Sequence, residues 1–128
     1  MISFDALTSH LDLSKKIYVG YSGGPDSSAL LYLLHINNIS NVEAIHINHN
    51  LSDNSLKWEE HCRNTTNKLG IKCHVELIDI KVDGDGLESA ARKARYKIFA
   101  KYLKKDEQIL LGHHSDDVAE TFLLRLFR

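Results

Sequence analysis

Several features that would identify a class of protein are scarce in this chain. Its 128 residues include only two cysteines, Cys62 and Cys73, and these lack the paired spacing of a disulfide framework or a zinc ribbon. This composition suits a reducing compartment, and we expect the cytoplasm. No apolar run approaches the length of a membrane span, and the first residues lack the regions of a signal peptide. We therefore expect no membrane partner.

An excess of charge of one sign is also missing. Sixteen Lys and Arg residues stand against seventeen Asp and Glu residues, for a net charge of -1. Such a balance gives no general electrostatic attraction for a polyanion such as RNA. Any nucleic-acid partner would need local patches or parts of a protein outside this chain. The length allows one domain, over residues 1–128.

The strongest motif present is the segment Ser22-Gly23-Gly24-Pro25-Asp26-Ser27-Ser28, which holds the only proline of the chain. It separates an apolar run typical of a buried strand from one typical of a helix. Backbone N–H groups and the helix dipole make such a junction an anion site. The segment lacks the lysine of GxxxxGK[ST] and the spacing of GxGxxG, which favours pyrophosphate held with a divalent metal. The simpler alternative is a turn followed by a helix cap.

Apolar periodicity predicts strands that alternate with helices, and hence an α/β fold with an open, mostly parallel sheet and helices on both faces. We expect the strand order 3-2-1-4. Strands are predicted over 16–21, 42–48, 73–80 and 109–113, and helices over 3–11, from the glycine loop to about 36, over 55–69, over 87–103 and from 115 onward. The last helix, capped by Ser115, is amphipathic to the final residue, so we interpret the chain as the front part of a longer protein, with a domain incomplete at its C-terminal end.

A second candidate site is His113-His114-Ser115-Asp116-Asp117, at the carboxyl end of the fourth predicted strand. If that strand neighbours the first, the segment opens onto the same crevice as the glycine loop. Asp116 and Asp117 are then candidate oxygen ligands for magnesium. The two acids could instead only complement a helix dipole, and the two histidines could be zinc ligands, although the neighbouring residues suit magnesium better.

Two further segments carry candidate binding residues. Arg92 and Arg95 share one flank of the predicted helix over 87–103, where they could grip phosphate or carboxylate, or Arg92 could form only a surface pair with Glu88. His46-Ile47-Asn48 ends the second strand, where its backbone groups could border an adenine ring. Trp58 is predicted to be core or cover rather than a stacking platform.

These segments, in this order, resemble the PP-loop ATP pyrophosphatases, and specifically the tRNA(Ile)-lysidine synthases. The segment Ser22–Ser27 matches the signature SGGxDS, and His46–Ser52 is similar to HxNHGL[RS] except that Asn50 replaces the usual glycine. Glu88–Tyr96 is similar to ExxARxxRY, and His113–Thr121 matches HHxDDxxET. The resemblance covers nearly the whole chain, as the N-terminal part of such an enzyme.

The resemblance implies an adenine nucleotide hydrolase-like fold and the ATP-dependent ligation of L-lysine to the wobble cytidine of tRNA(Ile), through an adenylated base and with release of pyrophosphate and AMP. It implies that Ser22–Ser27 cradles the pyrophosphate and that Asp26, with Asp116 or Asp117, holds Mg²⁺. Arg92 and Arg95 would position phosphate or the target nucleotide. His46–Asn48 and His113 would border the adenosine.

The resemblance also implies that most tRNA contacts come from domains outside this chain, and that this part alone does not complete the reaction. A homodimer is one option for the assembly. Two alternatives remain open: a thiolase-like PP-loop enzyme that modifies tRNA, and a nucleotide-binding fragment without catalytic activity. A thiolase would need paired cysteines, which Cys62 and Cys73 do not supply.

Overall fold

The computed structural model describes residues 11–49, 53–78, 84, 86–104, 107–115 and 118–125, without the side chains of Asp26, Glu88 and residues 112–125. Most of the helix expected over 3–11 lies outside these residues. Within them, five strands form one sheet in the order β3-β2-β1-β4-β5. The strands are β1 (Ile17–Gly20), β2 (Val42–Asn48), β3 (Lys72–Leu77), β4 (Gln108–Ser115) and β5 (Val118–Arg125). The first four are parallel, which confirms the expected order 3-2-1-4.

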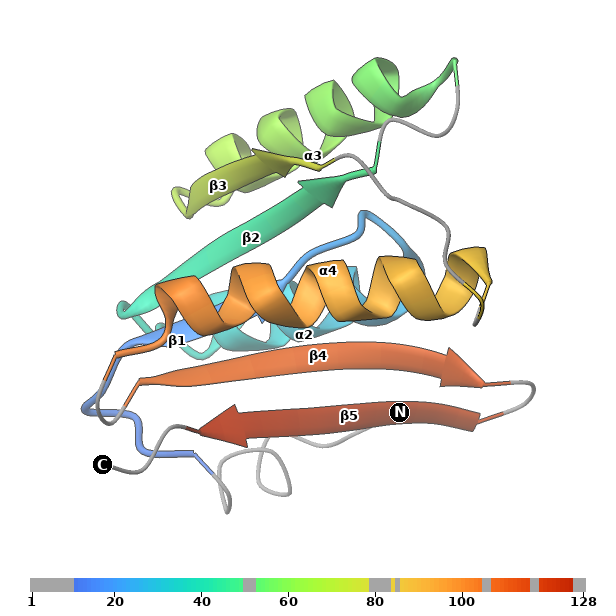
Figure 1. The fold of residues 1–128 in the computed structure, drawn as a ribbon. Helices are drawn as coiled ribbons and strands as arrows, with labels where there is room; N and C mark the ends of the chain where they lie inside the picture. Colours follow the sequence, from blue (N-terminus) through green and yellow to red (C-terminus); the bar gives the residue numbers. More distant parts are fainter. Residues whose placement is uncertain are drawn as a thin grey trace.

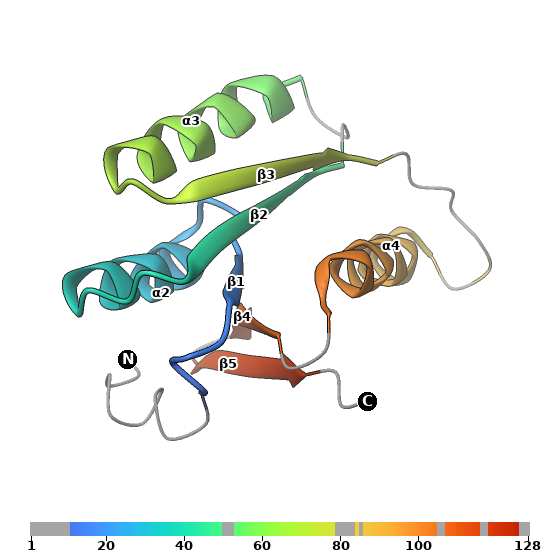
Figure 2. The ribbon, with the colours of Figure 1, turned by 90° about the vertical axis from the view of Figure 1, so that its left-hand side faces the viewer.

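Among the described residues, three helices cover the two faces of this sheet (Figures 1 and 2). They are α2 (Pro25–Ile36), α3 (Ser55–Lys68) and α4 (Leu87–Tyr102). Helices α2 and α3 lie on one face, and α4 lies on the other. The predicted open α/β sheet with helices on both faces is therefore confirmed. No helix among the described residues is long and apolar enough to cross a membrane.

Successive side chains of a strand point to opposite faces of the sheet, and apolar side chains form a separate core on each face. In β1, Ile17 and Val19 face α2 and α3, whereas Tyr18 faces α4. In β4, Leu110 joins the first core, and Ile109 and Leu111 join the second. Strands that are apolar on both faces are typical of a parallel sheet sandwiched between helices. The two cores hold the carboxyl ends of β1, β2 and β4 in fixed positions.

The predicted helix from Ser115 onward is wrong. Ser115 is the last residue of β4, and the chain returns as β5, which pairs with β4 in antiparallel register from Gln108↔Arg125 to Ser115↔Val118. The eight residues of β5 include Val118 and Phe122, and so short an apolar segment does not distinguish a helical period from a strand. Pairing decides the outcome, because the outer edge of β4 offers backbone groups that a strand can satisfy.

Candidate phosphate loop and adjoining pocket

The loop between β1 and α2 is stabilised by its own serines. The Ser22 backbone N–H donates to Ser27 Oγ (3.1 Å), and the two hydroxyl oxygens are also 3.1 Å apart. The Gly24 N–H donates to Ser22 Oγ (3.2 Å), and Gly24 is the N-cap that precedes Pro25 in the first turn of α2. Ser27 is buried. The loop is therefore preorganised, and the first turn of α2 provides backbone N–H groups that have no partners within the helix.

Helix α3 packs against the outside of this loop. Gly23 has φ +84°, and a Cβ there would lie 2.9 Å from Cys62 Sγ and 3.1 Å from the Trp58 ring. Glycine suits this position because it adopts a left-handed backbone readily and has no Cβ to clash with these neighbours. The Trp58 indole Nε1 donates to the Ser22 carbonyl at 2.5 Å. The loop is thus held from within by serines and from outside by α3.

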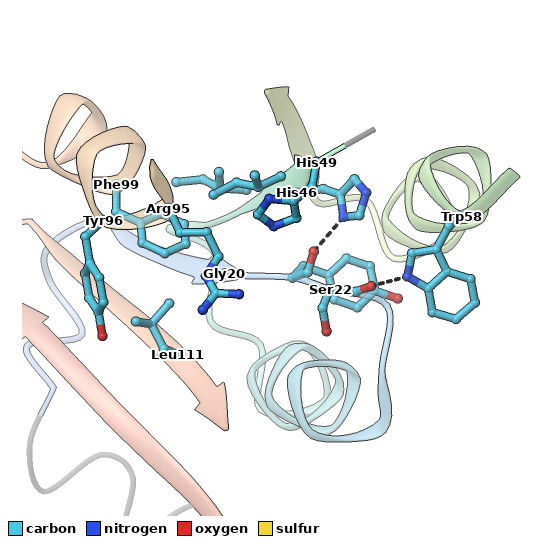
Figure 3. A pocket seen from close by; sticks show the side chains of 12 residues that line it. Gly20, Ser22, His46, His49, Trp58, Arg95, Tyr96, Phe99 and Leu111 are labelled. Carbon is cyan, nitrogen blue, oxygen red and sulfur yellow. Dashed lines mark hydrogen bonds between the residues drawn. The ribbon is translucent and has the colours of Figure 1, made fainter. Parts of the chain in front are cut away.

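A pocket of about 400 Å³ adjoins the loop at the carboxyl ends of β1 and β2, beside Leu111 in the middle of β4 (Figure 3). Neighbouring strands β1 and β4 lie on opposite sides of the point where the strand order reverses, and open α/β sheets bind ligands at such a point. The pocket is lined by Gly20, Tyr21, Ser22, Ile45, His46, Ile47, His49, Trp58, Arg95, Tyr96, Phe99 and Leu111.

Two histidines and one arginine are among the polar side chains that line the pocket. Because a carbonyl only accepts, His46 Nδ1 donates to the Tyr21 carbonyl (2.9 Å), which leaves Nε2 as an acceptor when the ring is neutral. Burial lowers the pKa of His49, and electrostatic interaction with the nearby Arg95 and His46 lowers it further. His49 Nδ1 is buried and has no hydrogen-bond partner among the described residues. A buried polar atom without a partner indicates a place for a polar ligand.

The predicted binding residues only partly converge on this pocket. Ser22, His46, Ile47 and Arg95 line it. Asn48 is buried, and its amide donates to Glu59 Oε1 (3.1 Å), so it joins β2 to α3.

The remaining predicted residues do not line the pocket or lie outside the described side chains. Arg92 is exposed, and its guanidinium carbon lies 5.5 Å from the centre of the Tyr96 ring. Glycines 23 and 24 and Pro25 form the loop beside the pocket rather than its lining.

The side chains of the predicted metal ligands lie outside the described part of the chain. Asp116 and Asp117 lie outside the described residues, and the side chains of Asp26 and His113 are not described. The backbone places Asp26 in the first turn of α2 and His113 in β4, the strand that neighbours β1. Among the residues that the structure does describe, no three His, Cys, Asp or Glu side chains are grouped as a metal site.

Sequence reasoning missed several side chains of the pocket, His49 and Trp58 among them. His49 lies in the segment His46–Ser52 that the motif comparison included. Its position near Arg95, however, depends on how α4 packs beside β2. Trp58 was expected to be core or cover, and its hydrogen bond to Ser22 was missed because this bond spans 36 positions and has no local signal.

Comparison with known proteins agrees with the motifs. Three curated relatives named tRNA(Ile)-lysidine synthase are those of Alkalilimnicola ehrlichii (44% identity, 86% of this chain and 26% of the relative), Photorhabdus laumondii (42%, 98% and 29%) and Buchnera aphidicola (47%, 90% and 27%). The chain thus spans roughly a quarter of the length of these relatives. The PP-loop domain family matches residues 2–128, and the chain belongs to that family.

Proposed function

We propose that this chain is the ATP-binding, catalytic part of a cytoplasmic enzyme that ligates L-lysine to the wobble cytidine of tRNA(Ile). The observation that carries the proposal is the preorganised loop beside a pocket in which His49 Nδ1 is buried without a partner among the described residues. The names of the relatives, together with the matching motifs, supply the substrate class.

Roles follow for the loop, for the pocket and for the residues near them. The loop of Ser22–Ser27 takes the β- and γ-phosphates, because backbone N–H groups and hydroxyls suit oxygen anions. His46–Asn48 and His113 border the adenosine. Arg95, which extends from α4 into the pocket (Figure 3), offsets charge near the reacting phosphate, and Arg92 positions phosphate or the target nucleotide. Adenylation of the base oxygen releases pyrophosphate, and the amine of lysine then displaces AMP.

Mg²⁺ is proposed as the cofactor that offsets charge on the departing pyrophosphate. Its candidate ligands are Asp26 with Asp116 or Asp117, since carboxylate oxygens are the ligands that Mg²⁺ prefers. In support, Asp26 and the residues after Ser115 follow the neighbouring parallel strands β1 and β4.

ATP binding by the isolated chain tests the nucleotide site. We expect a saturable calorimetric signal that Arg95→Gln weakens roughly tenfold, because a charged hydrogen-bond donor is lost. The matched control is Lys97→Gln, which removes an exposed charge from the same helix and should bind ATP like the unchanged protein. Absence of ATP binding by the unchanged chain would contradict the proposal. The assignment of substrates is checked separately, by lysine incorporation into tRNA(Ile) by the full enzyme and its Arg95→Gln variant.

The thiolase-like alternative is disfavoured by the state of the cysteines. Cys62 is fully buried, and burial raises the pKa of its thiol to about 12. Burial likewise raises the pKa of Cys73. A sulfur relay or cluster site needs accessible thiolates, because the thiolate is the nucleophile and the metal ligand. Neither cysteine lines the pocket.

A further inference from the structure

Helix α3 reaches the phosphate loop through one aromatic side chain. The Trp58 Nε1–H donates to the Ser22 carbonyl, and the edge of the indole lies 3.1 Å from the position of a Cβ at Gly23. The same ring therefore contacts two consecutive residues of the loop, one by a hydrogen bond and one by packing. Figure 3 shows Trp58 beside Ser22, on the side of the pocket opposite Arg95.

Trp58 is itself held in place. Its ring stacks on His61, one turn further along α3, with ring centres 5.1 Å apart and planes inclined by 24°. The next residue, Glu59, accepts the hydrogen bond from Asn48 and pairs with Arg63 at 3.5 Å. This end of α3 is thus anchored to the carboxyl end of β2, so the indole has a fixed support although about half of it is exposed.

The bond to the Ser22 carbonyl fixes the peptide plane between Ser22 and Gly23. Because a peptide is planar, the direction of that carbonyl also sets the direction of the Gly23 N–H on the opposite side. A loop that binds phosphate through backbone N–H groups depends on such directions being set before the ligand arrives.

We propose that Trp58 is a positioning residue that holds the Ser22–Gly23 peptide in the orientation that binds the phosphates of ATP. This inference rests on the proposed function of the loop. It assigns Trp58 to phosphate binding rather than to stacking on the base, since the indole N–H is bonded to the loop and one face of the ring already stacks on His61.

Calorimetric titration of three variants of the chain with ATP, inorganic pyrophosphate and adenosine tests this assignment. Trp58→Phe keeps an aromatic ring but removes the donor, and should weaken ATP and pyrophosphate binding about three- to tenfold while adenosine binding is unchanged. Trp58→Ala also removes the ring that packs against Gly23, and should weaken the binding of ATP and of pyrophosphate further. Leu56→Ala, an exposed position on the same helix, is the control and should bind all three ligands like the unchanged chain.

The outcomes separate the inference from the proposed function. Unchanged pyrophosphate binding by Trp58→Phe overturns the positioning role while the site itself stands. An equal loss for adenosine and ATP also overturns it, because Trp58 would then act as a wall for the nucleoside. If the unchanged chain binds neither ATP nor pyrophosphate, the proposed function fails and this inference fails with it. Circular dichroism of each variant shows that the fold is retained.

Discussion

At the scale of single residues, Gly23 is the most constrained position of the loop. A side chain there would combine a left-handed backbone with contacts of 2.9 Å to Cys62 Sγ and 3.1 Å to Trp58. Gly70 provides a matched control, since it has φ +69° but nothing within 4 Å of an added Cβ. Gly70→Ala should cost about 1 kcal/mol of unfolding free energy from backbone strain alone. Gly23→Ala should cost about 1–3 kcal/mol more, because of the overpacking.

Urea unfolding of both variants measures this difference. Equal losses would show that Cys62 and Trp58 move aside without cost, which would contradict a firm support for the loop by α3. Titration with ATP adds a second comparison, because we expect Gly23→Ala to weaken binding and Gly70→Ala to leave it unchanged.

The sequence predicts residues of the site when their signal is local. The loop of Ser22–Ser27 combines glycines, hydroxyls and a following helix within a few positions, so its place as a turn between β1 and α2 could be predicted from residue types. The partner of Asn48 could not be derived, because Glu59 reaches it only after α3 has packed on β2. The contact of Trp58 with Ser22 could not be derived for the same reason, since it joins residues that are distant in the sequence.

At the scale of elements, Glu43 joins three strands near their amino ends. From β2, its carboxylate pairs with Lys16, just before β1, at 2.9 Å, and with His74 of β3 at 2.5 Å. Burial alone would raise the pKa of Glu43, but the hydrogen bonds from His74 and Lys16 outweigh it and hold the pKa below its ordinary value of 4.5. The folded protein therefore binds fewer protons here than the unfolded chain, so this contribution is present above about pH 4.5 and is lost as the pH falls through the folded pKa.

Glu43→Gln tests this contribution by urea unfolding at several pH values. We expect a loss of about 1 kcal/mol near neutral pH, since the pair is partly exposed, and a smaller difference from the unchanged protein in acid. Glu60→Gln, at an exposed position on α3, should show little difference at any pH. A constant difference for Glu43→Gln from neutral pH down to about pH 3 would contradict the proposed pairing.

Element prediction succeeded where the apolar pattern was long or clearly alternating. The strand over 42–48 and the helix starting at residue 55 agree with β2 and α3, and the helix over 87–103 agrees with α4 to within one residue. It failed after Ser115, where eight residues suit either period and the free edge of β4 decides. The apolar pattern of a segment therefore distinguishes a helix from a strand only where it fits one of the two periods and not the other.

At the scale of the whole molecule, the pocket is lined by side chains from the helices on both faces of the sheet. Trp58 comes from α3 on one face, whereas Arg95 and Phe99 come from α4 on the other. The alternation of strands and helices predicts a parallel sheet, whereas the order 3-2-1-4, and with it the crevice beside β1, was expected from the resemblance to the PP-loop enzymes. Which side chains line the crevice depends on how α4 packs, and that depends on the core formed by Tyr18, Phe99 and Ile109.

A ligand that contacts both faces should stabilise the fold as a single unit. ATP bound to the native state alone raises the free energy of unfolding by about 2.7 kcal/mol when its free concentration is one hundred times its dissociation constant. We therefore expect ATP to raise the midpoint of urea unfolding of this chain, and adenosine at the same concentration to raise it less, because adenosine has no phosphates for the loop. Arg95→Gln, with affinity lowered roughly tenfold, should lose about half of the effect of ATP at that fixed concentration, whereas Lys97→Gln should retain it. A midpoint that does not respond to saturating ATP would mean that the loop and the pocket do not bind one ligand together.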